Sequence, residues 1–277
     1  MNSSVQRTIS GVLFIGIMVG GLLVHPLLYA LLTVLLMVGM LHEFFRMNLG
    51  NTLKWHRRLA IATAITFFII VYSVLHFNAP FRYVAIPAFM LLTLLCGALT
   101  LKSGEEFSKI TYVFTGLLYI AIPLSLSNFL VFDAQGSFNG LLMLSFFCII
   151  WSSDVGAYCF GLLFGKNGPK LSPTISEHKS WAGFWGGLAM ALFAGTILYL
   201  CGWLRFQLVH CLGMAAVMHV AGVFGDLFES KWKRVAGIKD SGNIIPGHGG
   251  LLDRFDSALF AIPAAVMYLV VFGISLI

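Results

Sequence analysis

The stretch from Ser230 to Asp256 gathers residue types suited to phosphate chemistry in an otherwise apolar chain. It holds five of the 17 lysines and arginines and three of the 11 acids. Basic side chains can neutralise phosphates, glycines let backbone N–H groups approach an anion, and carboxylates can hold a hard divalent cation. The combination predicts a basic, glycine-rich, metal-binding pocket suited to phosphoryl or nucleotidyl transfer.

Three aspartates flank this stretch and are predicted to bind metal. Asp226 stands at the end of one apolar run, while Asp253 and Asp256 open the next run and fall on one helical face. A hairpin that brings three carboxylates together could hold Mg²⁺ with the help of water and substrate phosphates. The alternative is that Asp253 and Asp256 only complement the positive end of a helix.

The residues between these acids are expected to contact phosphate, although a plain loop rich in turn residues is the alternative. His248, which lies between glycines, could donate to a phosphate oxygen or assist proton transfer near neutral pH. The cationic residues are Lys233, Arg234 and Lys239, and the glycines are Gly242, Gly247, Gly249 and Gly250.

Two further segments carry polar residues at the edge of apolar runs. Asp154 lies inside one run, where an acid is energetically unfavourable and so usually marks a function; a structural acid bonded to a neighbouring helix is the alternative. Lys179 and Ser180 are expected near the first turn of a helix, a reasonable anion site, or else Lys179 extends from the membrane interface. Candidate caps of that helix are Ser172, Thr174 and Ser176, after Pro169 and Pro173.

Composition fixes the class of protein. Hydrophobic residues make up 59% of the chain and charged residues 10%, which excludes an ordinary soluble domain. The apolar runs are long enough to cross a bilayer as helices and do not alternate, so we expect an all-α polytopic membrane protein. Nine runs are expected, at roughly 8–24, 27–45, 59–77, 84–101, 111–131, 140–164, 181–202, 207–226 and 255–277.

The distribution of lysine and arginine predicts the orientation. If the N-terminus is cytoplasmic, fifteen basic residues lie on the cytoplasmic side and only Arg82 and Arg205 lie outside. The loops at about 165–180 and 227–254 then face the cytoplasm, and a bacterial inner membrane is the expected location. Because the basic residues are spread over several loops, the net charge of +6 suits anionic lipid and phosphate, not nucleic acid.

The two halves of the chain differ in their charged residues. Up to about residue 135 the runs contain almost no ionisable residue, whereas charges enter or border the runs from Trp151 onward. We therefore expect residues 1–135 to form a scaffold of about five spans. Residues 136–277 are expected to form the catalytic part, with about four spans and the two cytoplasmic loops.

The polar residues resemble a known family at fixed spacing. Four segments of the stretch are similar to the phosphatidate cytidylyltransferases, also called CDP-diacylglycerol synthases: Ser230–Arg234, Lys239–Gly242, Pro246–Gly250 and Asp253–Asp256. Support extends upstream to Gly225–Ser230, Lys179–Gly183 and Asp154–Tyr158. The chain departs from the family at Trp232, Ser180 and Ala182, and its N-terminal half resembles the family only in hydropathy.

The resemblance implies that phosphatidate and CTP give CDP-diacylglycerol and pyrophosphate, with Mg²⁺ as cofactor. Residue by residue, it implies metal ligands at Asp226, Asp253 and Asp256. It implies catalytic roles on phosphate for Lys233, Arg234, Lys239 and His248. The implied substrate-binding residues are Asp154, Lys179, Ser180, Asp240, Gly247, Gly249, Gly250 and Arg254.

Two other functions stay open at this point. The same chemistry could act on another lipid phosphate, and a panel of lipid acceptors would separate the two substrates. A membrane transporter could also bury acids and bases among its helices, but its charges should lie near the midplane of discontinuous, repeated spans. The oligomeric state is not fixed by the sequence, so a homodimer is left open.

Overall fold

The computed structural model is almost entirely helical, which confirms the predicted fold class. It describes residues 3–242, 244 and 249–274, with side chains from Ile9 onward. Within this part of the chain, eight helical stretches are long and apolar enough to cross a membrane. Nine spans were expected; the first expected run lies in helix α1 (Ser3–Leu23), whose apolar stretch, Ile9–Leu23, is too short to count among the eight.

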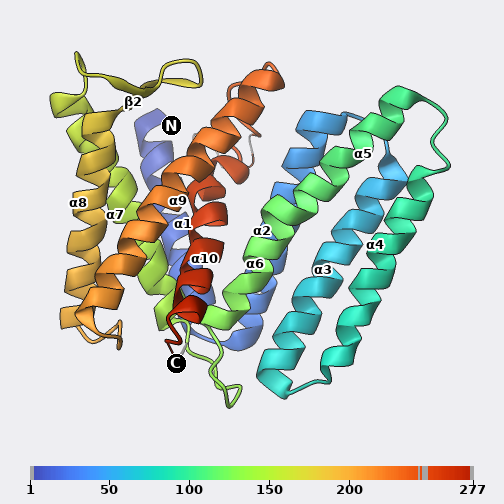
Figure 1. Cartoon of the computed structure of the whole chain (residues 1–277), viewed down its shortest axis with the longest axis horizontal. Coiled ribbons are helices and arrows are strands. Elements are labelled where there is room, and N and C mark those ends of the chain that lie inside the picture. Colours follow the sequence, from blue (N-terminus) through green and yellow to red (C-terminus); the bar gives the residue numbers. More distant parts are fainter. Residues whose placement is uncertain (1–2, 243, 245–248, 275–277) are drawn as a thin grey trace. The chain divides into compact units, whose positions relative to one another are not determined.

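The chain folds into two compact units (Figure 1). The first unit comprises residues 1–139 and 240–254. After α1, the described part of this unit forms four further helical stretches, of which the last runs from Gly104 to Leu130 without a break. Their elements are α2 (Pro26–Leu49), α3 (Lys54–Phe77), η1 (Phe81–Val84), α4 (Ala85–Ala98), α5 (Gly104–Gly116), the π-helix η2 (Leu117–Ala121), α6 (Ile122–Leu126) and η3 (Ser127–Leu130).

The second unit comprises residues 140–239 and 255–277. A two-stranded antiparallel hairpin connects its first two helices, and Figure 1 shows the hairpin and the C-terminal end of α9 at the same end of this unit. Its elements are α7 (Leu141–Phe164), β1 (Lys170–Ser172), β2 (Ser176–Ser180), α8 (Trp181–Leu200), α9 (Leu208–Val235) and α10 (Leu252–Val271), whose first residues belong to the first unit. The predicted division near residue 135 into scaffold and catalytic parts stays a prediction.

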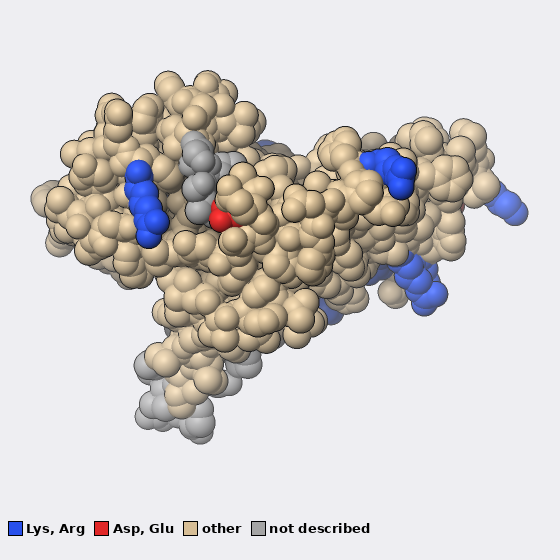
Figure 2. Space-filling model, turned by 90° about the horizontal axis from the view of Figure 1, so that it is seen from below, with Lys and Arg blue, Asp and Glu red and all other residues tan. Residues whose placement is uncertain are grey.

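Large apolar side chains cover the outer surface of the helices. Leu99 is 81% exposed, Leu163 72% and Phe89 71%. Figure 2 shows one face of the molecule, on which Lys, Arg, Asp and Glu are sparse. Exposed apolar surface of this extent marks contact with lipid, so this is an integral membrane protein.

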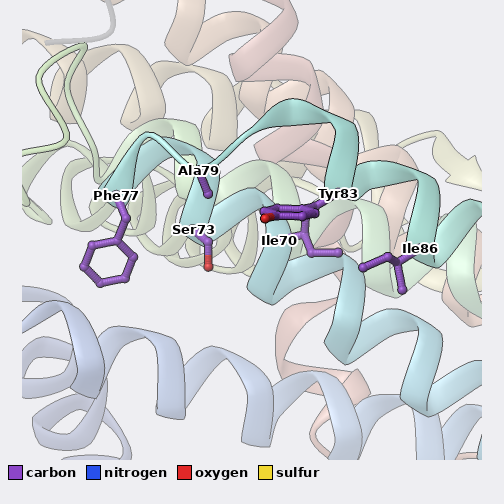
Figure 3. Close-up of a pocket in the computed structure, with 6 residues that line it drawn as sticks. All are labelled: Ile70, Ser73, Phe77, Ala79, Tyr83 and Ile86. Carbon is purple, nitrogen blue, oxygen red and sulfur yellow. The ribbon is translucent and has the colours of Figure 1, made fainter.

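An open apolar groove of about 480 Å³ lies in the first unit between α3, η1 and α4 (Figure 3). No acid or base lines it, so this groove is not where the predicted phosphate chemistry lies. Its lining residues are Ile70, Ser73, Phe77, Ala79, Tyr83 and Ile86.

Glycines let α7 and α8 pack closely in the second unit. A Cβ atom added to Gly156 would lie 2.6 Å from Met190 Cγ and 2.8 Å from the Gly186 carbonyl oxygen. A Cβ atom on Gly183 would lie 2.8 Å from the Ala157 carbonyl oxygen. Small residues at such crossings are what membrane helices use to bring their backbones together. This close packing holds α7, which carries Asp154, against α8, which begins directly after Lys179 and Ser180.

Widening this crossing is expected to destabilise the second unit. Gly156→Val should lower the free energy of unfolding by about 1–3 kcal/mol, because a carbonyl oxygen cannot move aside for the new side chain. Thermal unfolding of the purified protein in detergent measures the change. Gly16→Val, in α1, is the matched control, since nothing lies within 4 Å of a Cβ atom there. Equal midpoints for both variants would contradict the close packing.

Candidate active site

An ion pair joins the hairpin to α9 in the second unit. Lys179 Nζ, near the end of β2, lies 2.6 Å from Asp226 Oδ2 on α9. The Ser230 hydroxyl, one turn further along α9, donates to Asp226 Oδ1 over 3.3 Å. The aspartate side chain is 37% exposed, whereas the lysine side chain is 22% exposed and its Nζ atom is buried, so the pair is accessible from the aspartate side. The structure thus brings together two predicted site residues that are 47 positions apart.

The first turn of α8 is capped by Ser180. Its hydroxyl accepts a hydrogen bond from the Gly183 N–H over 3.1 Å, and the side chain is buried. The prediction that Lys179 and Ser180 lie at the start of this helix is confirmed. The predicted caps Ser172, Thr174 and Ser176 were wrong, because residues 170–180 form the β-hairpin instead.

Helix α9 continues past the predicted end of its span to Val235, so the first part of the expected loop 227–254 is helical. Hydropathy could not reveal this, because the last turns of α9 carry charges. The last turns of α9 place Asp226, Ser230 and Lys233 on one helical face. Lys233 Nζ pairs with Glu229 Oε2 at 2.8 Å, and this glutamate is only 1% exposed. The pair holds Lys233 on the same face of α9 as Asp226, two turns further along the helix.

Helices α9 and α10 touch beside the aspartates. A Cβ atom on Gly225 would collide with the Asp256 carbonyl oxygen and lie 3.2 Å from Phe260 Cβ. This contact sets Asp226 and Asp256 beside each other, where Asp226, Glu229 and Asp154 all act on Asp256 by charge repulsion. Asp256 Oδ1 accepts a hydrogen bond from the Ser257 N–H over 2.7 Å.

Four carboxyl groups and two lysines thus gather in the second unit, so acids outnumber bases within the group. We call this group the acid–lysine cluster: Asp154, Lys179, Asp226, Glu229, Lys233 and Asp256. Such a charge imbalance among apolar helices is unfavourable, which favours binding of a cation.

Most of the other predicted residues lie in the first unit's segment 240–254, whereas Arg234 and Lys239 belong to the second unit. Asp253, at the start of α10, accepts hydrogen bonds from the Ser241 N–H over 3.0 Å and from the Gly250 N–H over 2.8 Å. It therefore organises its own loop, and Gly249 takes a left-handed conformation there with φ of +83°. Four of these predicted site residues are exposed: Arg234, Lys239, Asp240 and Arg254. Gly247 and His248 lie outside the described residues.

Two buried glutamates were missed by the sequence reasoning. Glu229 joins the acid–lysine cluster, and Glu43 in α2 accepts hydrogen bonds from the loop that precedes α10. The available signal was the same for both, namely an acid inside or at the end of an apolar run.

A metal centre made by protein ligands alone is not present in the described part of the chain. No three His, Cys, Asp or Glu side chains converge closely enough there to hold an ion. Asp226 and Asp256 are neighbours in the second unit, whereas Asp253 is bound to its own loop. The predicted roles of all these residues stay predictions.

Comparison with known proteins supplies an independent result. A family model described as the cytidylyltransferase family matches residues 5–272. A phosphatidate cytidylyltransferase of Bacillus subtilis (strain 168) is 37% identical over 189 residues, which cover 68% of this chain and 68% of that protein. A phosphatidate cytidylyltransferase of Rickettsia bellii (strain RML369-C) is 37% identical over 185 residues, which cover 64% of this chain and 78% of that protein. The range of the family model includes every residue of the acid–lysine cluster.

Proposed function

Since the chain belongs to the cytidylyltransferase family, we propose that it transfers the cytidylyl group of CTP to phosphatidate and releases pyrophosphate. The observation that carries the proposal is the Lys179–Asp226 ion pair at 2.6 Å within the acid–lysine cluster. It places a cation and several hard oxygen ligands together at one end of an apolar helical unit. A lipid phosphate at the membrane interface and a nucleotide from solution both need such groups.

The reaction makes and breaks one bond at the α-phosphorus of CTP. An oxygen of the phosphatidate phosphate attacks that phosphorus, the bond to the bridging oxygen of the β-phosphate breaks, and pyrophosphate leaves in line with the attacking oxygen. Both reactants are anions, so positioning and neutralisation of charge provide most of the catalysis.

Lys179 and Lys233 are the residues of the cluster that bind phosphate. Each is held by a carboxylate, Lys179 by Asp226 at 2.6 Å and Lys233 by Glu229 at 2.8 Å, so little side-chain ordering remains to be done when substrate binds. Their charges oppose the repulsion between the two anionic substrates. Arg234, Lys239, Arg254 and Ser180 contribute further phosphate contacts, and Asp154 helps to shape the site. The glycines from Gly247 to Gly250 hold the nucleotide, and Asp240 and His248 contact substrate.

Magnesium fits the donor set of the cluster. Asp226 and Asp256 offer carboxylate oxygens, and the acids of the cluster outnumber its two lysines, so a divalent cation would offset the excess. Mg²⁺ normally uses one or two carboxylates and completes its coordination with water and substrate phosphates, so these two aspartates and the substrates would be enough to hold it. When bound, it supplies Lewis-acid stabilisation of phosphate charge. We assign Asp253 as a third metal ligand because it lies three residues before Asp256 in the sequence.

The enzyme is expected to lose its activity when divalent cations are removed. EDTA should reduce formation of CDP-lipid to background, and Mg²⁺ added in excess should restore it, because the substrates and the cluster share the same negative charge. Release of pyrophosphate from the purified protein measures the effect. Undiminished turnover in EDTA would contradict the assignment of Asp226 and Asp256 to a metal.

The site is proposed to face the cytoplasm of a bacterial cell from its inner membrane. Fifteen of the 17 lysines and arginines lie on the cytoplasmic side when the N-terminus is placed there, and CTP is a cytosolic metabolite. The relatives from Bacillus subtilis and Rickettsia bellii are bacterial proteins.

Incubation of the purified protein with labelled CTP and a panel of lipid phosphates tests the proposal. Phosphatidate is expected to give the highest kcat/KM. Faster reaction of another lipid phosphate would identify a different acceptor with the same chemistry, and the absence of any labelled lipid would overturn the proposed function.

A further inference from the structure

We propose that Glu43 of α2 is a positioning residue that sets the loop from Asp240 to Arg254 and thereby the affinity for CTP. The inference rests on the proposed function, because this loop carries the residues assigned to the nucleotide. Glu43 lies in the predicted scaffold, 198 positions before its partner Ser241. All the contacts that follow lie within the first unit.

Glu43 accepts three hydrogen bonds while it is only 3% exposed. Its Oε1 accepts from the Leu251 N–H over 3.0 Å, and its Oε2 accepts from the Leu252 N–H over 2.9 Å and from the Ser241 hydroxyl over 3.2 Å. Every partner donates, so both oxygens must accept. A carboxylate can do this, whereas a glutamine presents an NH₂ group to one of the donors.

The contacts explain why an acid is tolerated at this buried position. The Leu251 and Leu252 N–H groups belong to the start of α10, where backbone N–H groups have no partner inside the helix. A helix N-terminus also carries partial positive charge, which stabilises an anion. Glu43 therefore caps α10 from another helix, and this stabilises the position of the loop that leads into α10.

Ser241 connects this cap to the predicted site. Its hydroxyl donates to Glu43, and its backbone N–H donates to Asp253 over 3.0 Å. Asp253 also binds the Gly250 N–H, so the two carboxylates hold both ends of the Asp240–Gly250 loop. If the Glu43 carboxylate moves, Ser241 loses its hydrogen-bond acceptor, and the contact between Ser241 and Asp253 is disturbed as well.

Two glycines of the motif leave room for the glutamate. A Cβ atom on Gly242 would overlap Glu43 Oε1, and one on Gly250 would lie 2.7 Å from Glu43 Oε2. Gly39, one turn earlier in α2, makes similar room for Leu251. Gly242 and Gly250 are therefore explained by close packing on α2, in addition to any contact of Gly250 with substrate.

The Glu43→Gln variant tests the proposal. The KM for CTP is expected to rise at least about tenfold, since a buried donor loses its acceptor, while the KM for phosphatidate stays within about twofold of the wild-type value. Thr33→Val, which alters another buried polar side chain of α2, is the matched control and should change neither KM. A KM for CTP that stays within twofold in Glu43→Gln overturns the inference, whatever happens to its thermal stability.

Gly242→Ala provides a second route if Glu43→Gln does not fold. The added methyl group displaces the Glu43 carboxylate and should raise the KM for CTP in the same way, while Gly104→Ala, with open space around it, should not. An unchanged KM in Gly242→Ala overturns the inference. A wild-type protein that makes no CDP-lipid overturns the proposed function itself, so the two failures are distinguishable.

Discussion

Asp226→Asn is expected to lower kcat by about a hundredfold to a thousandfold, the size of effect seen when a preorganised charged or polar group is removed from a reacting centre. The variant removes one oxygen ligand from the proposed metal and the anionic partner of Lys179 Nζ, which lies 2.6 Å away. Turnover of labelled CTP by the purified variant, at saturating phosphatidate, measures the change.

The same variant is expected to unfold at a temperature no lower than the wild type does. Asp226 and Asp256 repel each other, so replacing one carboxylate by an amide relieves a charge imbalance. Glu105→Gln is the matched control, because Glu105 also forms an ion pair of 2.6 Å with a lysine but on an exposed helix face. It should retain full turnover. A large loss of stability in Asp226→Asn would show that the aspartate is structural.

Lys179→Gln is expected to reduce kcat/KM by about a hundredfold and, unlike Asp226→Asn, to lower thermal stability. Removing the ammonium group takes a cation from the substrate phosphates. It also increases repulsion among the carboxylates that remain, because Lys179 acts on both Asp226 and Asp154. Steady-state kinetics and thermal unfolding in detergent measure the two effects.

Lys170→Gln is the control from the same hairpin. Lys170 Nζ donates to the backbone carbonyl oxygen of Gly165 over 3.0 Å and not to a carboxylate, and its loss should change kcat/KM by less than twofold. If Lys170→Gln and Lys179→Gln were equally impaired, the hairpin as a whole would matter and the specific role of Lys179 would be refuted.

The meeting of Lys179 with Asp226 could be predicted from the sequence. Two consecutive apolar runs joined by a short connection form antiparallel helices, so the start of α8 and the last third of α9 must lie at the same end. The glycine at position 225, beside Asp226, then permits the contact with α10 that brings Asp256 near. Local patterns were sufficient here because neighbouring elements supply the contacts.

The remaining parts of the site depended on contacts that hydropathy does not encode. The end of an apolar run marks the edge of the membrane and not the end of a helix, which is why the extension of α9 to Val235 was missed. The hairpin at 170–180 was missed because its strands have only three and five residues. Glu43 was missed because its partners begin 198 positions later in the chain.

The most direct test of the central claim follows the two ends of CTP in one reaction. Purified wild-type protein receives phosphatidate, Mg²⁺ and CTP labelled at either the α- or the γ-phosphate, with Asp226→Asn as the inactive reference. We predict that the α-label appears in lipid, that the γ-label appears in pyrophosphate in equal amount, and that both products require Asp226. Label that stays in CTP, or α-label released as free CMP with none in lipid, would contradict the assignment of cytidylyl transfer to the acid–lysine cluster.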